Sequence, residues 1–292
     1  MRKINTGTMQ ADKPIAISLF GGTGFIGSHF RSKSVFKPLP IARESRTPLS
    51  DQVLYLISTT HNYHVFEDPH KDIDTNLSIL VDVLANLKPG YSVFNFVSSW
   101  FVYGDTELPA HEEACCHPKG FYSITKRAAE ELLVSYCRTF GIDYRILRLC
   151  NVYGPGDGGA AAAPGKKNAL QFIIDRLQNN EPVDLYHGGH FYRDYLHVDD
   201  VVTAIDLVLS QGELNQVYNI GSGEKILFLD LINLARHLTA SNSSLRTIEP
   251  PPFHQVVQVK DFYMNCDRLK ALGFAPRVTL EEGLRSLCQS TP

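Results

Sequence analysis

No apolar run in the 292-residue sequence approaches the roughly 18 residues that a membrane-spanning helix needs, and the stretch 15–20 is too short for a secretory signal. The net charge is only −3, so we expect neither nucleic acid nor a membrane as a partner. The six cysteines include no CxxC pair, which favours reduced thiols in a cytoplasmic protein. His61, His64 and His70 lack the spacing of a metal site, so we expect no metal.

Apolar strands alternate with helices through the first half of the chain. A hydrophobic fraction of 43% and a charged fraction of 20% are ordinary for a globular protein. The alternation predicts a Rossmann-like α/β fold, a doubly wound parallel sheet that binds its ligand at the carboxyl ends of the strands. The expected strands are 15–20, 39–42, 53–57, 92–97 and 144–149, and the expected helices are 25–34, 74–87 and 122–140.

The connection between the strands 39–42 and 53–57 is unusually short. A helical crossover with a further strand needs a dozen or more residues, which the segment 43–52 does not provide. We therefore expect the sheet to be shortened between its second strand and the strand that follows.

Three parts of the chain are expected to differ in role. Residues 1–13 form a flexible N-terminus, 14–150 form mainly the dinucleotide-binding part, and 151–292 form mainly a smaller C-terminal substrate-binding lobe. The last two parts make one continuous unit, with segments that cross between them. The run 154–165, rich in glycine and alanine, predicts a mobile loop beside the site. Further helices are expected at 167–179, at 199–210 with Asp199 as its N-cap, and at 228–239, 267–272 and 279–288.

Gly21, Gly24 and Gly27 directly follow the first strand and open the first helix. In a dinucleotide-binding turn such glycines permit a tight bend, a close approach of backbone to the diphosphate, and close packing of helix on strand. Free amides at the helix start, including those of Phe25 and Ile26, then face the anion. The pattern predicts a dinucleotide cofactor.

Tyr122 and Lys126 lie four residues apart in a predicted helix, so they share one face of it. A cation beside a phenol stabilises the phenolate and lowers the pKa of the phenol. Next to a nicotinamide, such a phenol can move a proton while a hydride moves at the same carbinol carbon. This pair predicts an oxidoreductase site.

The Gly-x-x-Gly-x-x-Gly turn with Tyr-x-x-x-Lys downstream resembles the short-chain dehydrogenase/reductase superfamily. Further segments narrow the resemblance to its extended branch, the NAD(P)-dependent nucleotide-sugar epimerases and dehydratases, and they cover the chain in the right order at 76–77, 97–104, 147–155, 192–200 and 218–222. The resemblance implies that Tyr122 is the general acid/base, that Lys126 holds the nicotinamide ribose, and that Ser99 binds the reacting oxygen. It also implies a nucleotide-diphosphate sugar as substrate, and a homodimer formed by the helices 74–87 and 122–140.

The same resemblance assigns residues to the substrate. Asn151 would lie near the sugar diphosphate, and Tyr186 would stack on the base unless it is an ordinary strand residue. Arg193 has the planar cation that suits a diphosphate, with an ion pair to Asp194 or Asp199 as the alternative. The remaining candidates are Asn168 and Leu170 near the base and Lys260 near the diphosphate.

Trp100 and Phe101 follow Ser99, where dehydratases of this branch carry Asp-Glu and decarboxylases carry a glutamate. Neither aromatic ring can move a proton, so we expect neither 4,6-dehydration nor decarboxylation. Epimerisation at C4 of the hexose and reduction of a 4-keto sugar remain.

Arg43 follows the second strand and resembles the arginine that contacts the 2′-phosphate of NADP(H) in related reductases, although Glu44 keeps NAD(H) possible. A shortened adenosine site also suits a cofactor that leaves after each turnover, as a reductase requires and an epimerase does not. We therefore favour NADP(H) and 4-keto reduction, with an NAD-dependent C4 epimerase as the alternative. A non-catalytic relative that senses nucleotides is a remote third hypothesis.

Overall fold

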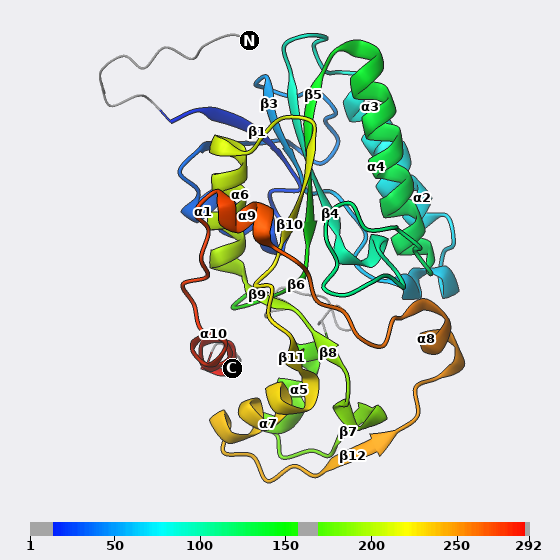
Figure 1. Cartoon of the computed structure of the whole chain (residues 1–292), viewed down its shortest axis with the longest axis vertical. Helices are drawn as coiled ribbons and strands as arrows, with labels where there is room; N and C mark the ends of the chain where they lie inside the picture. Colours follow the sequence, from blue (N-terminus) through cyan, green and yellow to red (C-terminus); the bar gives the residue numbers. More distant parts are fainter. Residues whose placement is uncertain (1–13, 157–168, 290–292) are drawn as a thin grey trace.

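The computed structural model describes residues 14–156 and 169–289, and its centre is a sheet of six strands (Figure 1). The strands lie in the order β10-β5-β4-β3-β1-β2, and every neighbouring pair is parallel. Their bounds are Ala16–Phe20 (β1), Lys37–Pro40 (β2), Gln52–Tyr55 (β3), Val93–Ser99 (β4), Asp143–Leu149 (β5) and Gln216–Ile220 (β10). The predicted doubly wound α/β fold is confirmed.

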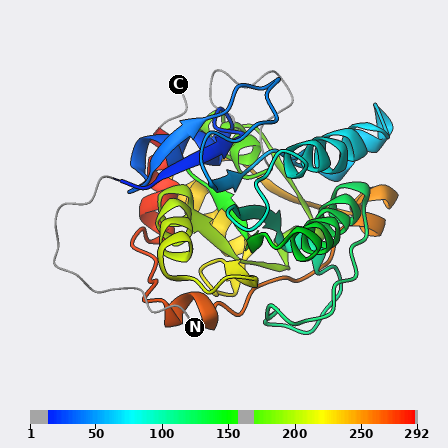
Figure 2. The ribbon, with the colours of Figure 1, turned by 90° about the horizontal axis from the view of Figure 1, so that it is seen from above.

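Helices cover both faces of this sheet (Figure 2). One face carries α1 (Phe25–Lys33) and α6 (Val198–Gln211), and the other carries α4 (Phe121–Phe140) and a helix that runs through α2 (Lys71–Ile73), the π-helical turn η2 (Asp74–Ser78) and α3 (Ile79–Leu84). Side chains alternate between the faces of a strand. Leu19 therefore packs in the core cluster on the side of α1 and α6, whereas Phe20 packs in the cluster on the side of α3 and α4.

The sheet is one strand short on the side of β2. Residues 41–51 lead from β2 to β3 without a helix or strand, and β3 pairs with the opposite side of β1. A doubly wound dinucleotide fold has a further strand beyond β2, so the expected shortening is confirmed. Pro38 and Pro40 lie in β2, and its edge position tolerates them because the outer side of an edge strand needs no hydrogen bonds.

A smaller lobe lies beyond the carboxyl ends of the strands, in the lower half of Figure 1. Its apolar core is formed mainly by α5 (Ala169–Gln178), α7 (Phe228–Leu238), α10 (Leu280–Gln289) and the strand pair β7 (Val183–Tyr186) and β12 (Leu245–Ile248). Two short pairs complete this region, β6 (Asn151–Tyr153) with β9 (Tyr195–His197), and β8 (Tyr192–Arg193) with β11 (Ile226–Leu227). The other elements are α8 (Pro252–Val257), α9 (Asp267–Ala271), η1 (Asn62–Phe66), η3 (Trp100–Val102) and η4 (His187–Gly189).

Several details differ from the expectations. The helix expected at 74–87 begins at Lys71 and contains the π-helical turn. Asp199 is not an N-cap, because His197 Nδ1 accepts its amide at 3.3 Å while its carboxylate pairs with Lys33 Nζ at 2.6 Å. The loop predicted at 154–165 lies largely outside the described residues.

All six cysteines are free. Among the described residues, no helix combines the length and the apolar character needed to cross a membrane.

Candidate active site

The glycine turn joins β1 to α1 at the carboxyl edge of the sheet. Gly21 has a φ of +79°, which glycine adopts without strain, and a Cβ on Gly27 would lie 2.3 Å from the Gly21 carbonyl oxygen. Gly24 is the N-cap of α1 and makes no side-chain hydrogen bond to the helix start. The first turn begins with Phe25 and Ile26 and contains no acidic residue. The free amides of this turn fit an anion such as a cofactor diphosphate.

Tyr122 lies in the first turn of α4, and 8% of its side chain is exposed. The hydroxyls of Ser99 and Ser58 lie near its phenol, and both lower the pKa of the phenol against the effect of burial. Ser99 ends β4 and Ser58 follows β3, so the ends of two neighbouring strands meet at the phenol. Burial raises the pKa of Tyr122, which keeps the phenol protonated at neutral pH.

Lys126 lies one turn further along α4 and is only 2% exposed. Its Nζ donates to the Val97 carbonyl oxygen at 2.7 Å and lies 4.1 Å from the centre of the Phe96 ring. Burial lowers the pKa of Lys126 to about 7, a shift that the Glu130 carboxylate opposes. Burial raises the pKa of Tyr122 and lowers that of Lys126, so the acidification of the phenol by Lys126 stays a prediction.

Trp100 and Phe101 begin η3 directly after Ser99. Their rings stack with centroids 4.0 Å apart, and Phe262 stacks on Trp100 at 4.5 Å. The Phe101 ring meets the Tyr122 ring edge-on at 5.9 Å. One wall beside the phenol is therefore aromatic, and it offers no acid or base at the two positions after Ser99.

Arg193 is buried at the end of β8, and its guanidinium donates only to backbone carbonyls in the hydrogen bonds seen for the described residues. It bonds to the oxygens of Tyr192 at 2.8 Å, Lys260 at 2.6 Å and Val259 at 3.0 Å. The predicted alternative, an ion pair with Asp194, is not formed, because that carboxylate accepts hydrogen bonds from the segment 222–223. Among the described residues Arg193 therefore forms no ion pair; burial lowers its pKa, and the nearby Asp261 carboxylate opposes that shift.

Asn151 and Tyr186 lie on β6 and β7. Asn151 Nδ2 donates to the Asp194 carbonyl oxygen at 2.9 Å. The half-buried ring of Tyr186 lies 4.6 Å from the ring of His254, which also bonds through Nδ1 to the Tyr63 hydroxyl at 3.2 Å. His254 was not among the predicted site residues, since no local pattern signals that α8 packs against β7.

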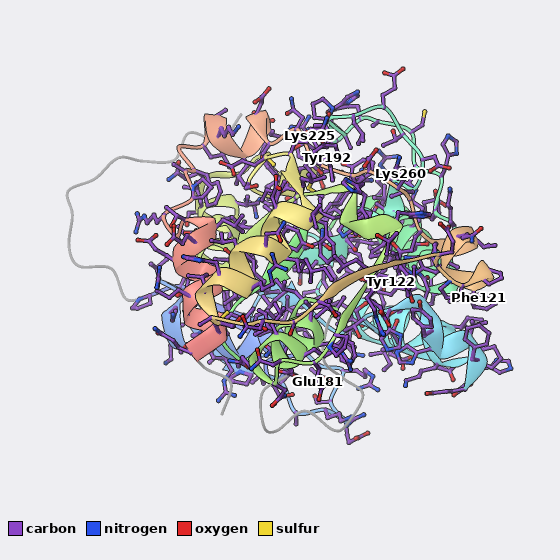
Figure 3. The ribbon with its side chains drawn as sticks, turned by 90° about the horizontal axis from the view of Figure 1, so that it is seen from below. Phe121, Tyr122, Glu181, Tyr192, Lys225 and Lys260 are labelled. Atoms are coloured by element: carbon purple, nitrogen blue, oxygen red, sulfur yellow. The ribbon has the colours of Figure 1, made fainter. Side chains whose placement is uncertain are left out.

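The last three substrate candidates differ in exposure. The side chain of Leu170 is 4% exposed in the core of the smaller lobe, which leaves only its backbone to face a ligand. Lys260 is exposed, and Figure 3 shows it on the same side of the molecule as Tyr192 and Lys225. Lys225, which sequence reasoning missed, lies with Nζ 4.1 Å from the centre of the Tyr192 ring. Asn168 lies outside the described residues.

Arg43 and Glu44 follow β2, and both are exposed. Within the described part of the chain, the Arg43 guanidinium has no ion pair or hydrogen bond. Arg46 differs, since its Nε lies 3.7 Å from Asp82 Oδ2. Arg43 is thus a free cation at the strand end where dinucleotide folds bind the adenosine ribose.

The three histidines considered for a metal lie in and beside η1. The rings of His61 and His64 stand 4.0 Å apart, and burial lowers the pKa of both, so they are neutral at pH 7. In the ranges 14–156 and 169–289, no group of three or more His, Cys, Asp or Glu side chains could hold a metal ion.

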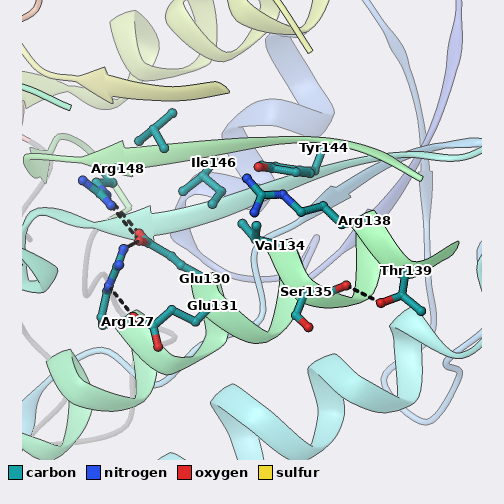
Figure 4. A pocket seen from close by; sticks show the side chains of 11 residues that line it. Arg127, Glu130, Glu131, Val134, Ser135, Arg138, Thr139, Tyr144, Ile146 and Arg148 are labelled. Atoms are coloured by element: carbon teal, nitrogen blue, oxygen red, sulfur yellow. Dashed lines mark hydrogen bonds and ion pairs between the residues drawn. The ribbon is translucent and has the colours of Figure 1, made fainter. Parts of the chain in front are cut away.

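A cavity of about 490 Å³ lies between α4 and the strands β5 and β10, and none of the predicted site residues lines it (Figure 4). Glu130, a lining residue, is 1% exposed and accepts from Arg148 at 2.8 Å and from Arg127 at 3.0 Å. Arg127 also pairs with Glu131 at 3.1 Å. These charges neutralise one another and hold α4 against β5, so we assign the cavity no part in the chemistry.

Comparisons with known proteins agree with this geometry. The model of the NAD dependent epimerase/dehydratase family matches residues 44–221. One relative is a trifunctional UDP-glucose 4,6-dehydratase/UDP-4-keto-6-deoxy-D-glucose 3,5-epimerase/UDP-4-keto-L-rhamnose-reductase of Arabidopsis thaliana. It is 30% identical over 80% of this chain. This chain spans only 35% of that protein's length. The GDP-6-deoxy-D-mannose reductase of Pseudomonas aeruginosa is 28% identical, over 91% of this chain and 94% of its own.

Two solved structures share the fold. The UDP-glucose 4-epimerase of Thermotoga maritima with UDP-glucose superposes with a TM-score of 0.81 at 25% identity, covering 94% of this chain and 98% of that one. The RMD protein of Pseudomonas aeruginosa complexed with NADPH superposes with a TM-score of 0.80 at 24% identity, and it too covers 94% of this chain and 98% of that one. The resemblance seen in the sequence is confirmed, and the chain belongs to the NAD dependent epimerase/dehydratase family.

Proposed function

We propose that the protein is an NADP(H)-dependent reductase of the C4 keto group of a nucleotide-diphosphate hexose. The observation that carries the proposal is Tyr122, a buried phenol that lies near the Ser99 hydroxyl and whose pKa is raised by burial. Reduction of a ketone needs a proton donor at the carbonyl oxygen, and a protonated phenol is that donor. Ser99 would bind the same oxygen.

A bound nicotinamide cofactor would supply the hydride. The glycine turn would hold its diphosphate, Lys126 its ribose, and the exposed Arg43 a 2′-phosphate. The missing strand beyond β2 leaves the adenosine end of the site less enclosed, which suits release of the oxidised cofactor after each turnover. Likeness to the RMD protein complexed with NADPH supports the same choice of cofactor.

The substrate side fits a charged and partly planar ligand. Arg193 would face the diphosphate, Tyr186 the base, and Asn151 the sugar. The aromatic wall of Trp100 and Phe101 holds no carboxylate to take a proton from C5, so we propose that the enzyme does not carry out 4,6-dehydration or decarboxylation. The Pseudomonas aeruginosa reductase, matched over nearly its whole length, supports reduction of a keto sugar.

A C4 epimerase is the second candidate, favoured by the likeness to the Thermotoga maritima UDP-glucose 4-epimerase. Incubating the protein with NADPH or NADH and a panel of 4-keto nucleotide sugars separates the two, with absorbance at 340 nm as readout. We expect oxidation of NADPH. If neither cofactor is oxidised and UDP-glucose is epimerised, the reductase proposal is wrong. A protein that binds nucleotide without turnover of either kind would be the non-catalytic relative.

We also propose a homodimer. Exposed apolar side chains lie on the outer face of α3 and α4, where Val81 is 45%, Ile124 48% and Leu132 44% exposed. These two helices lie side by side at the surface, so the same pair in a second copy could cover them (Figure 1).

A further inference from the structure

The start of α4, where Tyr122 lies, has a glycine in the position of the capping side chain. A helix leaves its first backbone amides without partners inside the helix, and the side chain of the N-cap residue usually accepts from one of them. In α4 the N-cap is Gly120, which makes no side-chain bond to the helix. Tyr122 is the second residue of α4, so its amide needs a partner from elsewhere.

Asn62 supplies that partner from a distant part of the chain. Its Oδ1 accepts from the Tyr122 amide at 3.1 Å, although the two residues are 60 positions apart. A backbone amide can only donate, so the atom that it meets is the oxygen of the Asn62 side chain. Ser123 Oγ accepts from the Gly120 amide at 2.8 Å, which is one half of a capping box. Asn62 provides the other half, which glycine cannot.

Asn62 and Gly120 fit closely together. Asn62 is 3% exposed, and a Cβ on Gly120 would lie 2.2 Å from its Oδ1 and 2.4 Å from its Cγ. These distances are far shorter than a van der Waals contact, so a side chain at position 120 would displace the amide. Gly120 has a φ of −119° and a ψ of 166°, an extended conformation that any residue adopts. The Asn62 side chain, and not the backbone conformation, therefore requires glycine here.

The turn that contains Asn62 is also held from outside α4. Asn62 is the first residue of η1, and Tyr63 follows it. The Tyr63 hydroxyl bonds to His254 Nδ1 at 3.2 Å, and the Tyr63 ring meets the Phe253 ring edge-on at 5.2 Å. Both partners belong to α8, which comes after β12 of the smaller lobe. Contacts independent of α4 thus help to place Asn62, as a residue that orients α4 requires.

We propose that Asn62 is a positioning residue for Tyr122, because it caps the turn of α4 that carries the phenol. Helix ends fray when they are not capped, and Tyr122 lies in the first turn. A proton donor must stay within hydrogen-bond reach of the oxygen that it protonates, and a misplacement of about 1 Å can cost 10²-fold in rate. This inference rests on the proposed role of Tyr122 in reduction.

The first test follows the hydrogen bond itself and needs no substrate. Hydrogen exchange of the Tyr122 amide is measured by mass spectrometry on overlapping peptides that cover 119–125. We expect Asn62→Ala to speed this exchange by roughly three- to thirtyfold, which is the effect of losing a helix cap. Asn62→Asp keeps an acceptor oxygen and should exchange at close to the natural rate. Unchanged exchange in Asn62→Ala would overturn the proposal.

Thr279→Ala is the matched control. Thr279 precedes α10, and its Oγ1 accepts from the Glu282 amide at 3.3 Å, so it caps a helix of the smaller lobe. The variant removes a cap of the same kind and leaves the start of α4 untouched. We expect it to change neither the exchange of the Tyr122 amide nor kcat.

The second test asks whether the cap serves the reaction. In the reductase assay we expect Asn62→Ala and Gly120→Ala each to lose roughly ten- to hundredfold in kcat, while KM for the cofactor and for the substrate changes by less than about twofold. Gly120→Ala acts by displacing the Asn62 amide, so the double variant should lose no more than either single variant. Losses that multiply in the double variant would overturn the proposal, since the two residues would then act separately.

Tyr122→Phe distinguishes a failure of this inference from a failure of the proposed function. If Tyr122→Phe keeps full activity, the phenol is not the proton donor, and the proposed function and the positioning role are both wrong. If Tyr122→Phe is inactive while Asn62→Ala and Gly120→Ala keep the natural kcat, the phenol acts without Asn62. In that case only the positioning role is wrong.

Discussion

Lys126 is a buried amine, and its burial lowers the stability of the fold. Its pKa falls from 10.5 to about 7 in the folded protein. One pKa unit corresponds to about 1.4 kcal/mol, so the lysine makes folding less favourable by roughly 4 kcal/mol at pH 7. Its hydrogen bond to Val97 and its contact with Phe96 offset roughly 1–2 kcal/mol of this destabilisation. We therefore expect Lys126→Met to stabilise the protein without cofactor by about 2–3 kcal/mol at pH 7.

The sign of the pH dependence follows from proton binding. Between pH 7 and 10.5 the unfolded chain holds more protons at this site than the folded protein does, so the stability of the natural protein rises with pH across that window. The advantage of Lys126→Met should be largest at and below pH 7 and should shrink towards pH 10.

Thermal unfolding at several pH values measures this difference. For a chain of this size, 2–3 kcal/mol corresponds to a rise of roughly 5–10 °C in Tm. Lys37→Met is the control, since Lys37 is exposed on β2 and its replacement should give no such pH-dependent gain. Equal melting temperatures of Lys126→Met and the natural protein at pH 7, or a gap that persists undiminished at pH 10, would refute the reasoning. A stabilised but inactive variant would show that the lysine is kept for function.

Three further predictions concern activity and assembly. Tyr122→Phe should lower kcat by about 10²- to 10⁴-fold while cofactor binding, followed by fluorescence, is kept; full activity would remove the phenol from the mechanism. Arg43→Ala should raise KM for NADPH by about tenfold or more and leave KM for NADH nearly unchanged, because a charge-assisted bond to phosphate is lost; equal effects on both cofactors would contradict a contact with the 2′-phosphate. Leu132→Glu should convert the proposed dimer to monomers in light scattering, and a natural protein that is already monomeric would exclude this interface.

Local patterns were enough to predict much of the architecture. The glycine turn, the apolar strands and the helix of Tyr122 depend on residues close in the chain, and each was found within a few positions of its predicted bounds. The missing strand was also predictable, because the length of the segment 43–52 alone excludes a crossover. The early start of the helix at Lys71 and its π-helical turn were not predicted, and Asn76 in that turn bonds to Thr59 after β3 and to Thr125 of α4, both distant from it in sequence.

The sequence by itself therefore determined the family of folds, the glycine turn and the pairing of Tyr122 with Lys126, since each rests on spacing within one strand, turn or helix. Only the tertiary structure decided the electrostatics of the site. Lys126 is four residues from Tyr122 in any helix, but its burial against Phe96, and hence the fall in its pKa, depends on where β4 packs. In the same way Ser58 and Ser99 come to lie near the phenol because β3 and β4 are neighbours in the sheet, and no spacing along the chain records that two strand ends meet.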